Sequence, residues 1–91
     1  MSYNNKPLEI FVLTYNRKQY LKYCLDSILS QSYRDFFITV IDNGSTDDTL
    51  ELLQEYEAKG VRHIVNEKNI GGIGSIKKAC GLVTTKWVML F

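Results

Sequence analysis

The sequence contains few of the residues that mark specialised classes of small protein. Its 91 residues include one proline, one tryptophan, one histidine and two cysteines. One histidine and two cysteines are too few for the usual zinc sites. Cys24 and Cys80 fall at apolar positions of predicted helices, so we expect both to be reduced, buried packing residues. A formal net charge of +1 gives no basic surface for nucleic acid, and we therefore expect no nucleic-acid partner.

Long hydrophobic segments are also absent from the sequence. No stretch approaches the ~20 apolar residues of a membrane span. The opening residues MSYNNKPLEIF do not have the pattern of a signal peptide. We therefore expect a cytoplasmic location, which is compatible with work at the inner membrane face. The sequence finishes inside an apolar run, KWVMLF, and on this ground we expect a truncated domain.

Apolar runs alternate with segments of helical periodicity along the chain. The second helix would bury Leu50, Leu53 and Tyr56, and the third would bury a stripe that contains Ile76. The order βαβαβαβ with short connections predicts an α/β fold, a Rossmann-like parallel sheet in three layers. Residues 1–7 are expected to form an N-terminal tail. Strands are predicted at 8–14, 36–42, 61–66 and 86–91, and helices at 18–30, 47–59 and 73–83.

A polar loop follows each of the first three predicted strands. Their sequences are TYNR (14–17), DNGSTDD (42–48) and NEKNIGG (66–72). In open parallel sheets, ligands bind beyond the carboxyl ends of the strands. The pattern therefore places a candidate binding site where these three loops meet.

The acidic loop after the second strand has two interpretations. Asp42 ends a buried strand, so it could accept hydrogen bonds from a ligand or simply lead into the helix. Ser45 or Thr46 is expected to cap the following helix, with Asp47 and Asp48 at its positive end. A calcium loop is excluded, because glycine is third here rather than sixth.

The glycine-rich segment GGIGSIKK is not a phosphate loop, because it lacks the G-K-[ST] signature. Three glycines at the start of a helix nevertheless expose backbone N–H groups that favour an anion. Lys77 and Lys78 could add positive charge or form an ordinary solvated helix face.

Taken in order, the motifs resemble the N-terminal half of family-two glycosyltransferases of the GT-A fold. The first strand leads into TYNR (14–17), the first helix ends in SILSQSY (27–33), and the second strand ends in DNGSTD (42–47). The segment NIGGIG (69–74) is similar to the N-x-G-G-x-G variant of rhamnosyl- and galactofuranosyl-type transferases. The resemblance covers residues 8–91 and implies a partial GT-A nucleotide-binding domain.

This resemblance implies an enzyme that transfers a sugar, generally with inversion, from a nucleotide diphosphate sugar. The donor would be a UDP-, GDP- or dTDP-sugar, and the acceptor a sugar or lipid-linked molecule of the cell-surface polysaccharide or glycolipid type. The parent enzyme would use Mg²⁺ or Mn²⁺, held by a D-x-D motif that normally follows the strand matching WVMLF. We therefore expect no catalytic residue and no metal site within the chain, and no transferase activity from the chain alone.

The resemblance also assigns residues to the nucleotide. Tyr15 is expected to stack on the base, and Asp42 to accept a hydrogen bond from its N–H group. Arg17 could reach a phosphate or only start the helix. Lys77 is the substitute for an arginine that many members carry in the third helix. The implied nucleotide site consists of Leu13, Thr14, Tyr15, Asn16, Arg17, Asp42, Asn43, Asn69, Gly71, Gly72 and Lys77.

Two alternatives remain open at this point. The chain could be a small α/β interaction or assembly domain without a ligand, with the apolar fourth strand pairing between copies to make a homodimer. It could also be a nucleotidyltransferase of similar fold. The usual glycine- and lysine-rich signature of those enzymes after the first strand is missing, because TYNR stands in its place.

Overall fold

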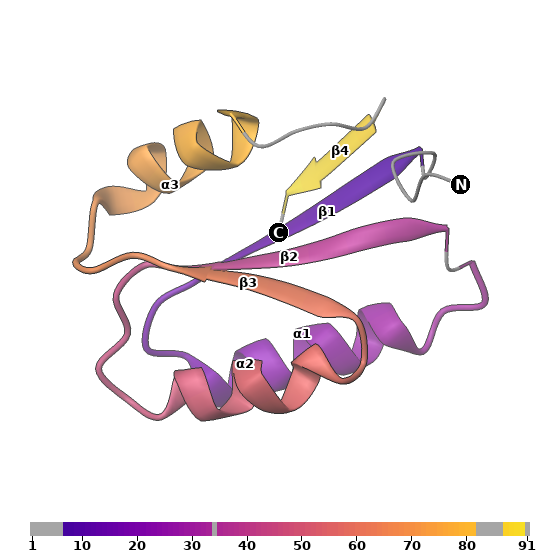
Figure 1. Ribbon diagram of the computed structural model, residues 1–91, viewed down its shortest axis with the longest axis horizontal. Coiled ribbons are helices and arrows are strands. Elements are labelled where there is room, and N and C mark those ends of the chain that lie inside the picture. Colours follow the sequence, from indigo (N-terminus) through magenta and orange to yellow (C-terminus); the bar gives the residue numbers. More distant parts are fainter. Residues whose placement is uncertain (1–6, 34, 82–86, 91) are drawn as a thin grey trace.

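The predicted order of strands and helices is confirmed. The computed structural model describes residues 7–33, 35–81 and 87–90, so most of the expected tail lies outside the described residues. The strands form one parallel sheet in the order β3-β2-β1-β4 (Figure 1). The elements are β1 (Leu8–Thr14), α1 (Lys18–Leu29), β2 (Phe36–Asp42), α2 (Thr49–Glu57), β3 (Val61–Val65), α3 (Gly71–Gly81) and β4 (Trp87–Leu90).

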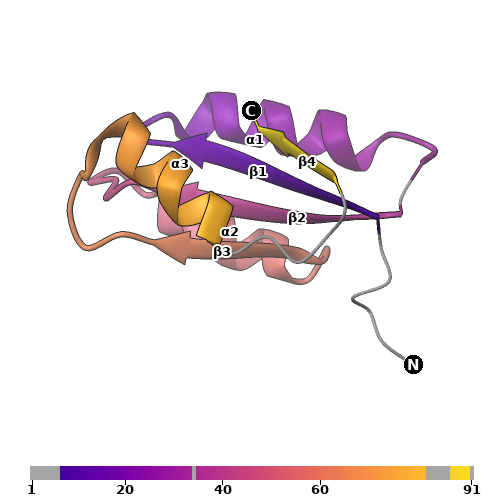
Figure 2. The same cartoon turned by 90° about the horizontal axis from the view of Figure 1, so that it is seen from above.

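The sheet lies between two layers of helices, which confirms the α/β, Rossmann-like, three-layer prediction. Helices α1 and α2 pack on one face, and α3 lies on the other (Figures 1 and 2). The larger hydrophobic core is on the α1 and α2 side, while Phe11 and Ile41 form a smaller core on the α3 side. The larger core contains Ile10, Val12, Leu21, Leu25, Ile28, Phe36, Ile38, Val40, Leu52, Leu53, Tyr56 and Val61.

The buried faces of two helices differ from those predicted. Leu50 was expected inside but is 44% exposed, and Thr49 takes the inward position instead. Thr49 is satisfied there because its hydroxyl donates to Asp47. Helix α3 starts at Gly71, two residues before the predicted start, and Ile76, which was expected on the buried stripe, is 38% exposed. The other predicted members of that stripe, Ile73, Cys80 and Val83, have side chains outside the description.

One buried carboxylate interrupts the apolar pattern of β1. Glu9 is 2% exposed, and its Oε2 accepts hydrogen bonds from the Thr39 hydroxyl at 2.9 Å and from Arg62 at 2.8 Å. The Arg62 guanidinium also lies 4.6 Å from the centre of the Phe37 ring. The carboxylate therefore has both a cationic and a neutral donor, which offset the cost of burying it at the edge of the core.

Helices α1 and α2 are joined by a polar contact at the rim of the larger core. The buried Tyr56 hydroxyl donates to Asp26, which also accepts from Lys22 at 3.1 Å. The Tyr56 hydrogen bond, followed by the Lys22 ammonium, lowers the pKa of the Asp26 carboxyl below its usual value.

Within the described residues, no helix is long and apolar enough to span a bilayer.

Candidate functional site

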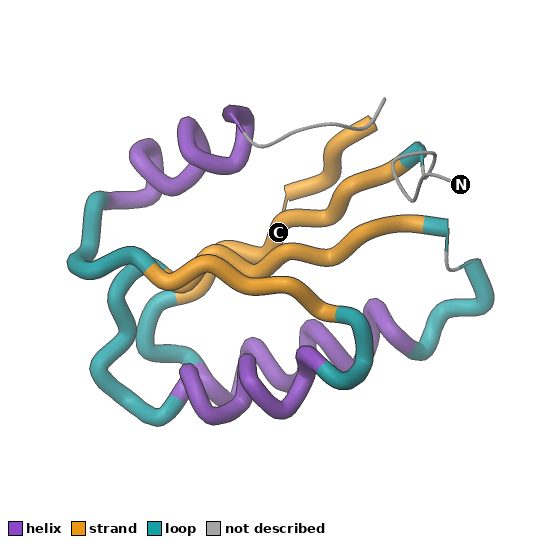
Figure 3. Tube along the Cα trace, in the orientation of Figure 1, coloured by secondary structure: helices purple, strands orange, loops and turns teal. Residues whose placement is uncertain are grey.

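The loops that follow β1, β2 and β3 lie together at the carboxyl end of the sheet, as the sequence predicted (Figure 3). The first two loops are joined by Asn16 and Ser45. Asn16 Oδ1 accepts the backbone N–H groups of Thr46 at 2.7 Å and of Asp47 at 3.2 Å. The Asn16 N–H in turn donates to the Ser45 hydroxyl oxygen at 2.8 Å.

Asn16 adopts a backbone conformation that few residues tolerate. Its φ of +52° is the only positive value at a non-glycine position among the described residues. Asparagine occupies this left-handed region more readily than most residues do. The conformation turns the side chain toward the β2–α2 loop, so the structure uses Asn16 to hold two loops together.

The predicted cap of α2 is wrong. Neither Ser45 nor Thr46 caps this helix, and the N-cap residue, Asp48, makes no side-chain cap hydrogen bond. Instead, Asp47 accepts the backbone N–H of Thr49 at 3.1 Å, and Asp48 pairs with Lys18 at 2.9 Å. Because Asn16 holds the N–H groups of Thr46 and Asp47, the chain enters α2 later than the sequence pattern indicated.

Asp42 lies at the end of β2, beneath the first loop. It is 1% exposed, and its carboxylate accepts the Ser45 hydroxyl and, at 3.3 Å, the Ser45 backbone N–H. The Ser45 oxygen also accepts the Asn16 N–H, so a short chain of hydrogen bonds runs from the first loop to the carboxylate. This arrangement fixes the position of the Asp42 carboxylate before any ligand arrives.

Asparagine side chains join the second and third loops. Asn43 Nδ2 donates to Asn69 Oδ1 at 2.7 Å, while Asn43 Oδ1 accepts from Asn66 Nδ2 at 3.1 Å and from the Ile70 N–H at 2.9 Å. Lys78 then donates to Asn66 Oδ1 at 2.6 Å. Asn43 and Asn66 are both buried, and their side-chain polar atoms are satisfied by each other and by Asn69, Ile70 and Lys78. Lys78, one of the two lysines considered in the sequence, therefore supports this loop.

Gly44 allows the second and third loops to approach closely. Its φ is +86°, and a Cβ at this position would lie 3.0 Å from the Lys68 carbonyl carbon and 3.1 Å from the Asn69 nitrogen. Both the backbone angle and the lack of space therefore require glycine here. This contact places Asn69 beside Asn43.

The three loops enclose an open cleft of about 410 Å³. Among the described residues that line it, Arg17 alone carries a charge, and no carboxylate is present. A volume of this size is within the range of small-molecule sites. The lining residues are Leu13, Thr14, Tyr15, Arg17, Tyr20, Asn43, Asn69, Gly71, Gly72 and Ser75.

Most of the residues that the resemblance assigned to the nucleotide line this cleft, but three do not. Asn16 and Asp42 belong to the hydrogen-bonded chain described above and are not among the lining residues, and Lys77 is exposed on α3. The sequence reasoning missed Tyr20 and Ser75. Each lies about one helical turn beyond a residue that it did identify, Arg17 for Tyr20 and Gly71 for Ser75, and this spacing was the available signal.

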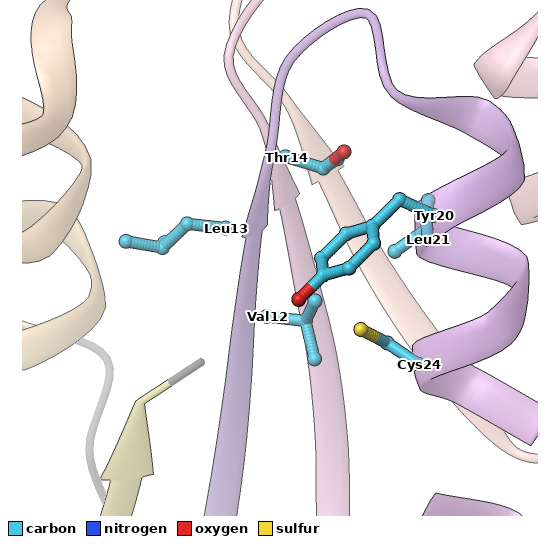
Figure 4. A pocket seen from close by; sticks show the side chains of 6 residues that line it. All are labelled: Val12, Leu13, Thr14, Tyr20, Leu21 and Cys24. Atoms are coloured by element: carbon cyan, nitrogen blue, oxygen red, sulfur yellow. The ribbon is translucent and has the colours of Figure 1, made fainter. Parts of the chain in front are cut away.

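A second, more apolar cavity of about 250 Å³ adjoins the cleft and shares Leu13, Thr14 and Tyr20 with it. In Figure 4, Leu13 points toward α3, whereas Tyr20 and Cys24 lie on the α1 side of β1. Cys24 is half-buried here rather than fully buried as expected. Among the described residues, β4 pairs with β1 from Leu8 to Phe11, and the cavity is lined by the next three residues of β1.

A divalent metal is implied for the parent enzyme, and a site for it would need several oxygen or nitrogen ligands close together. In residues 7–33, 35–81 and 87–90, no group of three or more histidine, cysteine, aspartate or glutamate residues could hold a metal ion. Asp42 and Asp47 are engaged with Ser45 and Thr49. These residues do not fit a metal centre.

The sequence matches the model of glycosyl transferase family 2 over residues 9–91. It is 36% identical over 91 residues to an uncharacterized glycosyltransferase of Methanocaldococcus jannaschii, covering 94% of this chain and 31% of that protein. It is 41% identical over 69 residues to the chondroitin synthase of Escherichia coli, covering 75% of this chain and 10% of that protein.

Solved structures show the same arrangement of strands and helices. The crystal structure of S. aureus TarS 1–349 in complex with UDP-GlcNAc matches with a TM-score of 0.82 at 28% identity. The match covers 92% of this chain and 25% of that one. The chain therefore spans less than a third of the length of each of these three proteins.

Proposed function

The chain belongs to glycosyl transferase family 2, and from this premise we propose that it binds the nucleotide of a nucleotide diphosphate sugar. The observation that carries the proposal is the cleft at the carboxyl end of the sheet, lined by neutral polar groups and one arginine. No carboxylate stands among the described residues that line it, which suits an anionic ligand. UDP is the first candidate, because TarS 1–349 binds UDP-GlcNAc and matches this chain at 28% identity.

The exposed lining residues are the ones that contact the ligand in this proposal. Tyr15 is 42% exposed at the mouth of the cleft, where its ring can stack on the base. Arg17 is exposed at the start of α1 and can pair with phosphate oxygens. Asn43 and Asn69 keep the opposite wall in place, because their side chains bind each other at 2.7 Å.

Asp42 is proposed to accept a hydrogen bond from an N–H group of the base. It is buried beneath the turn that carries Tyr15, and the Ser45 hydroxyl occupies its carboxylate. A base that takes the place of this hydroxyl at Asp42 Oδ1 requires the Ser45 side chain to turn away. The exchange of one donor for another keeps the carboxylate satisfied throughout.

The parent protein is proposed to transfer the sugar with inversion to a sugar or lipid-linked acceptor, in the cytoplasm or at the inner membrane face. Inverting transfer needs a general base near the acceptor. The described residues that line the cleft include no carboxylate or histidine for this role. We therefore expect the purified chain to bind nucleotide without transferring sugar, and measured turnover would contradict this part of the proposal.

The proposal is tested by titrating the ¹⁵N-labelled chain with UDP, GDP and dTDP, with and without Mn²⁺. We expect one nucleotide, UDP first, to bind and to shift the amide signals of Tyr15, Gly71 and Gly72. The binding should persist without Mn²⁺, because the described residues form no metal centre. If none of the three nucleotides binds, the proposal fails, and the ligand-free interaction domain becomes the better interpretation.

A pair of charge-matched variants locates the phosphate. Arg17→Ala removes the cation that lines the cleft. Lys59→Ala removes a cation beyond the end of α2, where its ammonium lies 4.5 Å from the centre of the Tyr56 ring. A charge-assisted hydrogen bond contributes ~1.5–3 kcal/mol, so Arg17→Ala should weaken UDP binding at least about tenfold. Equal affinities for the two variants would place the phosphate elsewhere.

A further inference from the structure

Ser75 is a buried polar residue of α3 that has no partner. It is 2% exposed, and its hydroxyl makes no hydrogen bond among the described residues. A serine inside a helix commonly donates to the carbonyl four residues earlier, and this one does not. The His63 Nδ1 atom is the other buried side-chain atom in this state within the described part of the chain. Of the two residues, only Ser75 lines the cleft.

The start of α3 lies in the same part of the cleft. The first backbone N–H groups of a helix have no acceptor within the helix, and this end attracts anions. The Gly71 N–H donates a hydrogen bond to Asn69 Oδ1 at 2.7 Å. A Cβ at Gly72 would meet nothing within 4 Å, so open space lies in front of this turn. Ser75 follows within the next turn of the same helix.

We infer that the Ser75 hydroxyl donates a hydrogen bond to a phosphate oxygen of the bound nucleotide. This inference rests on the proposed function and names one further residue that contacts the ligand. Three features favour phosphate over a neutral group: the positive end of α3, the nearby Arg17, and the absence of carboxylates among the described lining residues. Lys77, to which the sequence assigned this role, does not line the cleft.

The lack of a partner for the hydroxyl has a second consequence. A buried donor without an acceptor lowers the stability of the folded chain, and its removal should be neutral or favourable. If Ser75 stabilised the fold instead, Ser75→Ala would lower the melting temperature of the free protein. Ser75→Ala should therefore weaken nucleotide binding while leaving the melting temperature of the free protein unchanged or raised.

The experiment compares Ser75→Ala with the wild-type chain, using uridine, UMP and UDP as ligands. We expect the variant to bind UDP about tenfold more weakly, because a donor to a charged oxygen is lost, and to bind uridine with unchanged affinity. Loss with UDP supports the inference whether or not UMP shows it, since the two differ by one phosphate. Ser27→Ala, at an exposed site on α1, is the matched control and should change neither affinity.

The remaining outcomes overturn the inference. Unchanged UDP affinity in Ser75→Ala, with the wild type binding normally, removes the role of Ser75 and leaves the proposed function intact. An equal loss for uridine and UDP would assign the hydroxyl to the ribose or base. Failure of the wild type to bind any nucleotide would refute both proposals together. The wild-type Ser75 amide signal gives a second measurement, because it should shift with UDP and not with uridine.

Discussion

The close approach of the second and third loops can be tested with one methyl group. Gly44 and Gly60 have nearly the same backbone angle, with φ of +86° and +88°. A Cβ at Gly60 would meet nothing within 4 Å, whereas one at Gly44 would lie 3.0–3.1 Å from three backbone atoms of Lys68 and Asn69. Gly60→Ala is therefore a control for the backbone strain of Gly44→Ala, without the clash.

The expected magnitudes follow from these two contributions. A left-handed backbone costs an L-residue roughly 1–2 kcal/mol, part of which is offset by the lower entropy of the unfolded chain. We expect Gly60→Ala to lose about 1 kcal/mol. Ordinary Cβ contacts begin near 3.4 Å, so Gly44→Ala must also displace the Lys68–Asn69 backbone. Overpacking of this kind costs ~1–3 kcal/mol, which gives a total loss of about 2–4 kcal/mol for Gly44→Ala.

Urea unfolding followed by circular dichroism measures this difference in the free energy of unfolding. In both variants, the slope of the free energy of unfolding against urea concentration should equal that of the wild type, because the surface exposed on unfolding does not change. Nucleotide affinity provides a second measurement. Gly44→Ala should weaken UDP binding, since Asn69 and the start of α3 move away from Asn43, and Gly60→Ala should not. Equal loss of stability in the two variants would refute the close approach of the loops.

Two further predictions concern the open space at α3 and the contact between α1 and α2. Gly72→Ala should keep or raise the melting temperature, because alanine favours helix and its Cβ has room. The same substitution should weaken nucleotide binding, because the methyl group fills part of the cleft. Unchanged affinity in a calorimetric titration would contradict this prediction. The lowered pKa of Asp26 stabilises the fold above the ordinary carboxyl pKa of about 4, and this contribution is lost as pH falls through the folded value. The stability difference between wild type and Asp26→Asn should therefore shrink from pH 6 to pH 2, and a constant difference would show that the carboxylate is not coupled to Tyr56.

The sequence predicted the framework of the fold closely, because the strands carry a strong signal. β1 and β2 have the predicted bounds, since both are apolar runs between polar turns and are covered on both faces. The helix faces were less predictable. Leu50 and Ile76 were expected inside, but the loops before α2 and α3 decide where each helix starts, and those loops are ordered by contacts between distant segments.

The site was predictable as a place but not as a set of contacts. The three polar loops after parallel strands had to meet, and they do. The sequence could not show that Asn16 accepts hydrogen bonds from Thr46 and Asp47, about thirty residues away. Nor could it show that the Ser45 hydroxyl donates to the Asp42 carboxylate. The bonds of the Asn16 side chain go with its left-handed conformation, which no local pattern specifies. Ser75 was missed for a related reason, since a small polar residue in a helix has no characteristic pattern of its own.

The hydrogen bonds of the loops divide the candidate residues into two groups. The Oδ1 atoms of Asn16 and Asn69, and both polar atoms of the Asn43 side chain, are engaged with neighbouring loops in the free protein, so a ligand that bound these atoms would have to break existing bonds. Ser75, by contrast, has a buried hydroxyl with no partner. Buried polar groups are normally satisfied, and an exception marks a place where the fold gives up stability. The bonded asparagine atoms therefore set the shape of the cleft, and the free energy of nucleotide binding should come from the groups that the fold leaves unsatisfied or exposed.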